Sequence, residues 1–259
     1  MAIGFNHKPG LVVYFTAGDP SLEATRAIAL EAIDAGADVI ELGVPFSDPL
    51  ADGPIIQRAS ERALTRGTSL KDVLALAKEI RAARPKAGLI LFTYFNPVLR
   101  YGLKRFADDA AAAGADGVLL TDVIVEEAGG YLAEMARVNL APVFLAAPTS
   151  TDERLEAIAS HSRGFIYAIS RTGITGTQQS VASDAAALVA RIRRWTTLPV
   201  AVGFGISNAE HVAQVAEFAD AAVIGSAIVD LIEKSAPGTE PDAVARFIKG
   251  LRQPVALAR

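Results

Sequence analysis

The nine residues AGADVIELG, at positions 35–43, join a short Ala-Gly-Ala-Asp turn to an apolar run. The same phrase returns at 113–116, before GVLLT at 117–121, and Phe-Ala-Asp at 218–220 stands before AAVIG at 221–225. Each copy lies where an Ala-rich stretch of helical period gives way to an apolar run of the kind that forms buried strands. The phrase therefore indicates a repeated helix–strand unit.

Eight such apolar runs alternate with amphipathic segments from one end of the chain to the other. The predicted strands lie at 11–16, 38–43, 89–94, 117–121, 142–146, 164–169, 199–203 and 221–225. Eight units without a Pro-, Gly- or Ser-rich linker predict one α/β domain over residues 1–259, a closed (β/α)8 barrel of the TIM-barrel type. An open, doubly wound sheet is the alternative. Asp19-Pro20 and the capping-box spacings at Ser150 and Glu153 and at Ser207 and Glu210 indicate helix starts.

The composition limits the classes of protein to consider. Apolar side chains make up 51% of the 259 residues, enough for a large core. Twenty-five Lys and Arg against 29 Asp and Glu leave a net charge of −4, which argues against a nucleic-acid partner. The absence of cysteine excludes disulfides and thiolate metal sites. With neither a signal peptide nor an apolar run long enough to span a membrane, we expect a cytoplasmic protein.

A single carboxylate, Glu41, interrupts the apolar strand predicted at 38–43. In a barrel this end of a strand carries the active site. Strand alternation puts Glu41 on the same face as Val39 and Gly43, and if that face points inward its apolar walls raise the pKa of the carboxyl group. Such a group can act as general acid and general base near neutral pH. The alternative is a structural glutamate paired with a neighbouring charge.

The loop that follows, at 44–56, is long for a connection between strand and helix, and it holds Asp48 and Asp52. Long loops at this end of a barrel are commonly functional. Asp48 precedes a proline and is equally well explained as a turn residue. Asp52 precedes Gly53 and Pro54, so it is either a functional carboxylate or a turn or N-cap residue.

Glycines follow the last two predicted strands. GFGIS at 203–207 ends the seventh strand and leads into a helix, and Gly225-Ser226 ends the eighth. In barrels these two loops and a helix N-terminus commonly bind phosphate, because bare backbone N–H groups converge there. The glycines can also serve only to permit tight turns.

The polar stretch at 170–180 suggests a lid over the site, with an ordinary connection as the alternative.

The positions of the lysines and histidines narrow the possible types of reaction. No lysine falls at a predicted strand end, which disfavours a Schiff base, and the three histidines form no cluster with carboxylates, so no metal site is expected. Carboxylates acting on a phosphorylated substrate fit proton transfer or a retro-aldol reaction. Aromatic and aliphatic residues near strand ends could line the pocket, although each could equally fill the barrel. They are Phe92, Tyr94, Leu119, Tyr167 and Phe204.

Five motifs resemble those of the tryptophan synthase alpha subunit family. ELGVPFSDPLADGP at 41–54 looks like the family signature. TAGDP at 16–20, SRTGITG at 170–176, GFGIS at 203–207 and GSAI at 225–228 stand in the family's order and spacing. The resemblance implies a TIM barrel that cleaves indole-3-glycerol phosphate by a retro-aldol reaction, giving indole and glyceraldehyde 3-phosphate in the last step of tryptophan biosynthesis.

The resemblance also implies roles for individual residues. Glu41 would be the catalytic acid and base, and Asp52 would bind the indole N–H and stabilise the positive charge that develops on that nitrogen. Tyr94 would support Asp52, and Tyr167 would approach the glycerol moiety. Thr175 would be the lid residue that meets Asp52. The remaining substrate-binding residues are Phe204 in the pocket wall and Gly176, Gly205, Gly225 and Ser226 at the phosphate.

The same resemblance implies a partner, a β subunit that carries pyridoxal phosphate, in an αββα heterotetramer. The alpha chain would have no cofactor, and the segments at 45–48 and 96–97 would face the partner. The chain departs from the family pattern in a shorter N-terminal segment, which would reduce the helix that plugs the barrel, and in Ile124, which replaces a common proline. The alternatives are a free-standing lyase, a catalytically idle barrel that activates a partner, and a sugar-phosphate isomerase.

Overall fold

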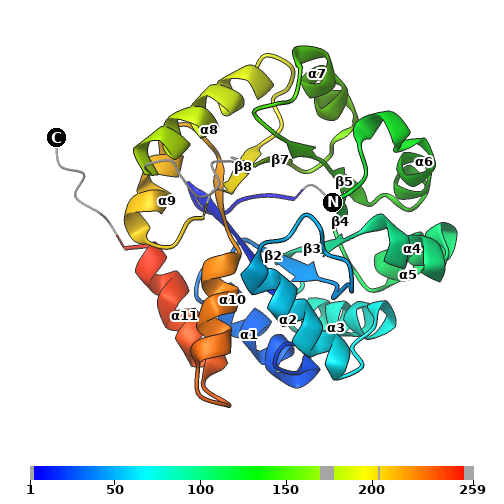
Figure 1. The fold of residues 1–259 in the computed structure, drawn as a ribbon, viewed down its shortest axis with the longest axis vertical. Helices are drawn as coiled ribbons and strands as arrows, with labels where there is room; N and C mark the ends of the chain where they lie inside the picture. The colour runs from blue at the N-terminus through cyan, green and yellow to red at the C-terminus, as the bar shows by residue number, and fades with distance from the viewer. Residues whose placement is uncertain (1–2, 170–177, 204, 254–259) are drawn as a thin grey trace.

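A ring of parallel strands surrounded by helices makes up the computed structural model, which describes residues 3–169, 178–203 and 205–253 (Figure 1). Every strand pair is parallel, as repeated strand–helix units require. The strands are β1 (Gly10–Thr16), β2 (Val39–Gly43), β3 (Gly88–Thr93), β4 (Gly117–Leu120), β5 (Ala141–Val143), β6 (Leu145–Ala146), β7 (Ile166–Ile169), β8 (Val200–Gly203) and β9 (Ala221–Ile224).

The barrel is closed by the covalent chain between β5 and β6. The order around the sheet is β5-β4-β3-β2-β1-β9-β8-β7-β6, so its two ends are consecutive strands separated only by Phe144. The strand predicted at 142–146 is thus two short strands, because its first part pairs with β4 and its second part with β7. At the break, the carbonyl of Phe144 accepts a hydrogen bond from the Tyr167 N–H at 3.1 Å. The predicted eight-membered (β/α)8 barrel is confirmed.

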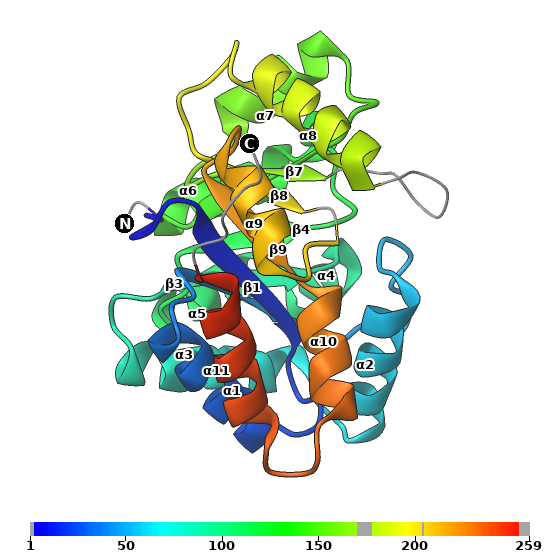
Figure 2. The same cartoon turned by 90° about the vertical axis from the view of Figure 1, so that its left-hand side faces the viewer.

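Helices follow the strands and cover the outside of the ring (Figures 1 and 2). They are α1 (Leu22–Asp34), α2 (Pro54–Thr65), α3 (Leu70–Ala83), α4 (Phe95–Tyr101), α5 (Leu103–Ala112), α6 (Gly129–Val138), α7 (Asp152–His161), α8 (Gln178–Ile192), α9 (Ala209–Ala216), α10 (Ser226–Lys234) and α11 (Glu240–Leu251), with a 3-10 turn at Val125–Glu127. Among the described residues, no helix has the length and hydropathy to cross a bilayer.

Two predicted helix caps are wrong by one residue. The N-cap of α7 is Thr151, whose hydroxyl accepts from the Arg154 N–H, while the Ser150 hydroxyl accepts from the Ala147 N–H at 3.2 Å in the preceding turn. The N-cap of α9 is Asn208 and not Ser207. In both cases two neighbouring residues have side chains that can cap, and the second of them takes the position.

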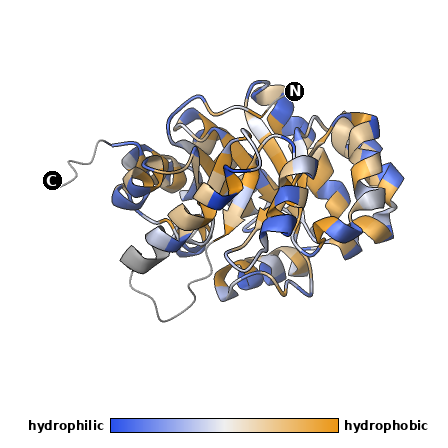
Figure 3. Ribbon diagram, turned by 90° about the horizontal axis from the view of Figure 1, so that it is seen from above, coloured by the Kyte–Doolittle hydropathy of each residue, from blue (hydrophilic) through white to orange (hydrophobic). Residues whose placement is uncertain are grey.

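The apolar residues form two layers, one inside the ring and one between the ring and the helices. Figure 3 shows the apolar strands at the centre and helices of mixed hydropathy around them. The inner layer contains Val12, Val39 and Ile90, and alternation then turns Glu41 inward from the same face as Val39. Phe5 also joins the inner layer and packs on Phe165, with ring centroids 6.0 Å apart. The irregular segment at 3–9, and not a helix, therefore fills this end of the barrel.

The repeated phrase has a structural role that its aspartates share. Each Asp lies just before a strand, accepts a hydrogen bond from a backbone N–H at the start of the preceding strand, and pairs with an arginine. The three sets are Asp38 with Leu11 and Arg252, Asp116 with Leu89 and Arg81, and Asp220 with Val200 and Arg193. Each carboxylate thereby fixes the register of two neighbouring strands on the side of the barrel opposite their carboxyl ends.

Candidate active site

A cavity of about 870 Å³ lies at the carboxyl ends of the strands. It brings together predicted site residues that are far apart in the sequence. These are Glu41 from β2, Phe92 from β3, Tyr167 from β7, and Gly205, Gly225 and Ser226 beyond β8 and β9. Leu119 belongs to the apolar layer inside the barrel and does not line this cavity, so it follows the alternative interpretation.

Glu41 is the most unusual residue of the cavity. Its side chain is completely buried, and neither carboxyl oxygen has a hydrogen-bond partner among the residues that the structure describes. The alternative of a paired structural glutamate is therefore not supported by any described residue. Burial raises the pKa of Glu41 from 4.5 to about 8, because its apolar surroundings disfavour the charged form. At neutral pH the group is mostly a protonated acid.

The position of the Tyr14 side chain depends on Gly43, the glycine that follows Glu41 on the same face of β2. The Tyr14 side chain lies against Gly43 so closely that a Cβ there would be 2.3 Å from the Tyr14 hydroxyl oxygen. Tyr14 itself lines the cavity, and its hydroxyl is 3.3 Å from the hydroxyl of Thr16. The sequence interpretation missed Tyr14. Alternation from Val12, which points inward, would have found it.

Asp52 lies in the loop between β2 and α2 and is not the N-cap of α2, because Gly53 has that position. The Tyr94 hydroxyl donates to Asp52 Oδ2 at 3.0 Å and accepts from the Ala51 N–H at 3.0 Å. The contact between Tyr94 and Asp52 is the one expected from the resemblance. Burial raises the pKa of Asp52 from 3.8 to about 6, while the hydrogen bond from Tyr94 opposes that shift.

The environments of the two carboxyl groups separate their pKa values. At pH 7, between about 6 for Asp52 and about 8 for Glu41, Asp52 is mostly ionised and Glu41 mostly protonated. A pair of titratable groups driven apart in this way is a signature of assigned acid and base roles. The site can therefore donate a proton from one carboxyl group while it stabilises positive charge with the other.

Replacing Tyr94 with phenylalanine should raise the pKa of Asp52 further, because the hydrogen bond that stabilises the carboxylate is lost. Less Asp52 is then ionised at neutral pH. We expect the acid limb of the pH–rate profile to move upward from about 6, by about one pH unit on the scale of a single charge-assisted hydrogen bond. The profile of kcat from pH 5 to 9 is the measurement. An unchanged acid limb would show that Tyr94 does not control Asp52.

The other end of the cavity is suited to an anion. Gly225 is the N-cap of α10 and supplies no side-chain hydrogen bond to the first turn, so backbone N–H groups starting near Ser226 remain available. Gly205 has φ +78°, a left-handed conformation that glycine adopts without strain. Both glycines line the cavity. Bare backbone and a helix N-terminus thus face the same space as Glu41.

Several predicted residues lie outside the described residues, namely Thr175, Gly176, Phe204 and the predicted lid at 170–177. The last part of that predicted loop is wrong, because residues 178–180 begin α8.

Asp48 is exposed and accepts a hydrogen bond from the Ser47 hydroxyl at 2.5 Å, in keeping with its interpretation as a turn residue. No group of three His, Asp or Glu side chains in the described parts of the chain could hold a metal ion.

The fold and the cavity define the class of protein, a (β/α)8-barrel enzyme with a buried carboxyl group and the glycine-rich ends of the last two strands facing one cavity. The family model of the tryptophan synthase alpha chain matches residues 3–253. The chain belongs to this family, as the motifs indicated. It is accordingly a carbon–carbon lyase of tryptophan biosynthesis, which catalyses the alpha reaction.

Individual relatives agree with this assignment. The chain is 54% identical over 230 residues to the tryptophan synthase alpha chain of Solibacter usitatus, and the alignment covers 89% of this chain and 86% of the relative. Identity to that of Geobacter sulfurreducens is 47%, over 96% of this chain and 94% of the relative. The structure of the alpha subunit from Legionella pneumophila has a TM-score of 0.88 at 37% identity, covering 95% and 92% of the two chains.

Proposed function

We propose that Glu41 and Asp52 perform the retro-aldol cleavage of indole-3-glycerol phosphate in this chain. The observation that carries the proposal is the completely buried Glu41 carboxyl, which has no hydrogen-bond partner among the described residues and shares its cavity with Gly225 and the start of α10. A protonated carboxyl group is what the first step needs, because C3 of the indole ring must be protonated before the bond to the glycerol chain can break. Proton transfer of this kind typically contributes about 10²–10⁴-fold in rate.

The steps balance without any other reactant. Glu41 donates its proton to C3, and the indole becomes an indolenine whose positive charge on nitrogen is stabilised by the Asp52 carboxylate. The Glu41 carboxylate then accepts the proton of the neighbouring glycerol hydroxyl. The electron pair of the carbon–carbon bond returns to the ring, which releases indole and leaves an aldehyde, glyceraldehyde 3-phosphate. Glu41 ends the cycle protonated, as it began.

The proposed binding mode spans the cavity from end to end. The phosphate lies on backbone groups of Gly205, Gly225 and Ser226, with Gly176 as a further contact. Tyr167, which lines the same cavity, approaches the glycerol moiety. Phe204 contributes to the wall, and Thr175 meets Asp52 from the lid. The chain uses no cofactor in this reaction.

The family supports a tryptophan synthase β subunit as partner and indole-3-glycerol phosphate as substrate, and pyridoxal phosphate belongs to the partner. We propose an αββα heterotetramer that works in the cytoplasm, with residues 1–259 as a single domain. The proposed contact surface includes the segments at 45–48 and 96–97. Large apolar side chains are exposed beside them, since Leu50 is 93% exposed, Leu99 52% and Ile124 48%. Exposed apolar side chains next to both segments support a protein interface there.

The experiment is indole release from indole-3-glycerol phosphate by the purified chain, with and without a β subunit. We expect slow release by the chain alone and a strong increase with the partner. Rapid release without stimulation would favour the free-standing lyase. No indole in either case, with the partner nevertheless activated, would support the idle barrel and refute the proposed chemistry.

A further inference from the structure

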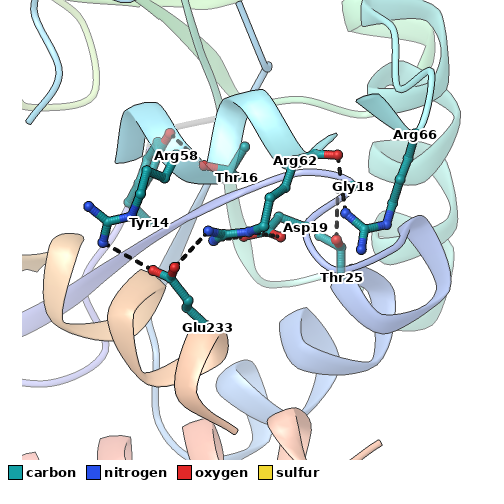
Figure 4. A network of polar contacts seen from close by, with 9 residues as sticks. All are labelled: Tyr14, Thr16, Gly18, Asp19, Thr25, Arg58, Arg62, Arg66 and Glu233. Atoms are coloured by element: carbon teal, nitrogen blue, oxygen red, sulfur yellow. Dashed lines mark hydrogen bonds and ion pairs between the residues drawn. The ribbon is translucent and has the colours of Figure 1, made fainter. Parts of the chain in front are cut away.

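A network of ion pairs joins three parts of the barrel beside the cavity (Figure 4). Arg62 of α2 donates through Nε and Nη2 to the two oxygens of Asp19, at 2.9 and 2.6 Å, and through Nη1 to Glu233 of α10 at 2.9 Å. Arg58, one turn earlier on α2, donates to the second oxygen of Glu233 at 3.2 Å. Asp19 lies in the loop after β1 and is 4% exposed.

The two helices in this network carry the two ends of the cavity. Helix α2 begins at Pro54, two residues after Asp52, and α10 begins at Ser226 in the anion-binding end. Between them, Ala59 of α2 and Val229 of α10 are buried together with Tyr14. A shift of α2 along α10 would therefore change the separation between Asp52 and the N-terminus of α10. Arg62 and Arg58 are the side chains that pair the two helices through Glu233.

We propose that Arg62 is a positioning residue that sets the distance between the indole-binding and the phosphate-binding ends of the cavity, by holding α2 to α10 through Glu233 and to the β1–α1 loop through Asp19. This inference rests on the proposed function, because it assumes a ligand that spans both ends. The separation between the two ends of the cavity would then select ligands by length, because only a molecule of one length can contact Asp52 and Ser226 simultaneously. Arg62 itself touches no substrate.

The geometry favours arginine over lysine at this position. The guanidinium group donates to both Asp19 oxygens and still has a third nitrogen that donates to Glu233. A lysine ammonium group has a single nitrogen and cannot make these three planar contacts at once. Asp19 is nearly completely buried, so removing its partner leaves an uncompensated charge and destabilises the fold. Glu233 is 29% exposed and can be removed while Arg62 stays paired to Asp19. Glu233→Ala is therefore the sharper variant, and Arg62→Lys is the conservative one.

The test compares binding of a linked ligand with binding of its two halves. The linked probe is 3-(indol-3-yl)propyl phosphate, which has both ends but lacks the hydroxyl group needed for cleavage, and the halves are indole and propyl phosphate. For Glu233→Ala we expect the Kd of the linked probe to rise about 5- to 20-fold, while the Kd of each half changes less than about twofold. Arg62→Lys should give a smaller change in the same direction. With substrate, kcat/KM should fall in parallel.

A control variant and three outcomes decide the result. Asp34→Ala removes an ion pair of the same kind, with Arg84, at the C-terminal end of α1, and should leave all three Kd values unchanged. If the linked probe binds Glu233→Ala as it binds the unaltered protein, or if the halves weaken as much as the linked probe, the positioning role is refuted. If the unaltered protein does not bind the linked probe at all, the proposed function fails first, which is a distinguishable result.

Discussion

Replacing Glu41 with glutamine should reduce indole release by about 10³-fold or more, to the background of the assay. Glutamine has the shape of the protonated acid but cannot transfer its proton, and acid–base groups typically supply about 10²–10⁴-fold in rate. The effect should be at the upper end of this range because one group serves both steps of the proposed mechanism. Glu41 makes no hydrogen bond within the described residues, so the substitution disturbs no partner. Steady-state turnover with excess β subunit is the measurement.

The fold of Glu41→Gln can be checked by its stability at alkaline pH. The pKa of Glu41 is about 8 in the folded protein and 4.5 in the unfolded chain. Between these two pH values the folded state therefore holds one more proton than the unfolded state. The contribution of Glu41 to stability is therefore fully present below pH 4.5 and is lost as the pH rises through about 8, at up to about 1.4 kcal/mol per pH unit. The variant should lack this loss and be more stable above pH 8. Substantial residual turnover by a stable variant would remove Glu41 from its role.

Asp52→Asn should lower kcat by about 10²–10³-fold with a change of only a fewfold in KM. Asparagine keeps a hydrogen-bond acceptor for the indole N–H but loses the negative charge, and charge stabilisation acts mainly when the ring becomes positive in the transition state. The acid limb of the pH–rate profile near 6, which reports ionisation of Asp52, should disappear as well. Turnover between pH 5 and 9 tests both effects.

A matched substitution separates this effect from a general loss of charge. Asp34→Asn changes a surface aspartate on α1, and turnover should be unaffected. If Asp52→Asn retained the full kcat, Asp52 would be only the turn residue that the sequence also allowed. Weaker binding of the linked probe together with an unchanged kcat would instead indicate a ground-state contact.

The barrel and the position of Glu41 follow from local patterns in the sequence. The repeated Ala-Gly-Ala-Asp phrase shows where strands begin, and alternation along 38–43 places Glu41 on the inward face with Val39. Both features depend only on residues that are close in the chain. The break at Phe144 could not be predicted in this way, because it depends on which neighbours pair with each part of the strand.

The contacts of the site that local sequence patterns could not predict join segments that are distant in the chain. Tyr94 meets Asp52 from 42 residues away, and Arg62 meets Glu233 from 171 residues away. Periodicity has no information about such pairs until the order of strands is known. The pKa of Asp52 has the same limitation, since it depends on burial by the closed barrel and on the Tyr94 hydroxyl. The resemblance suggested the first contact, but neither the resemblance nor the patterns suggested the second.

The divided fifth strand also has a consequence for how the protein opens. β6 pairs with β7 only through Leu145 and Ala146, whereas β1 and β2 pair along five residues from Val12 to Thr16. The β6–β7 ladder is therefore one of the two shortest in the barrel, together with β8–β9, which also pairs through two residues on each strand. Sub-global unfolding should begin where the fewest backbone bonds must break together. Amide hydrogens at 143–146 should exchange with solvent before those of β1, and loss of the β6–β7 ladder would open the closed ring into a single curved sheet.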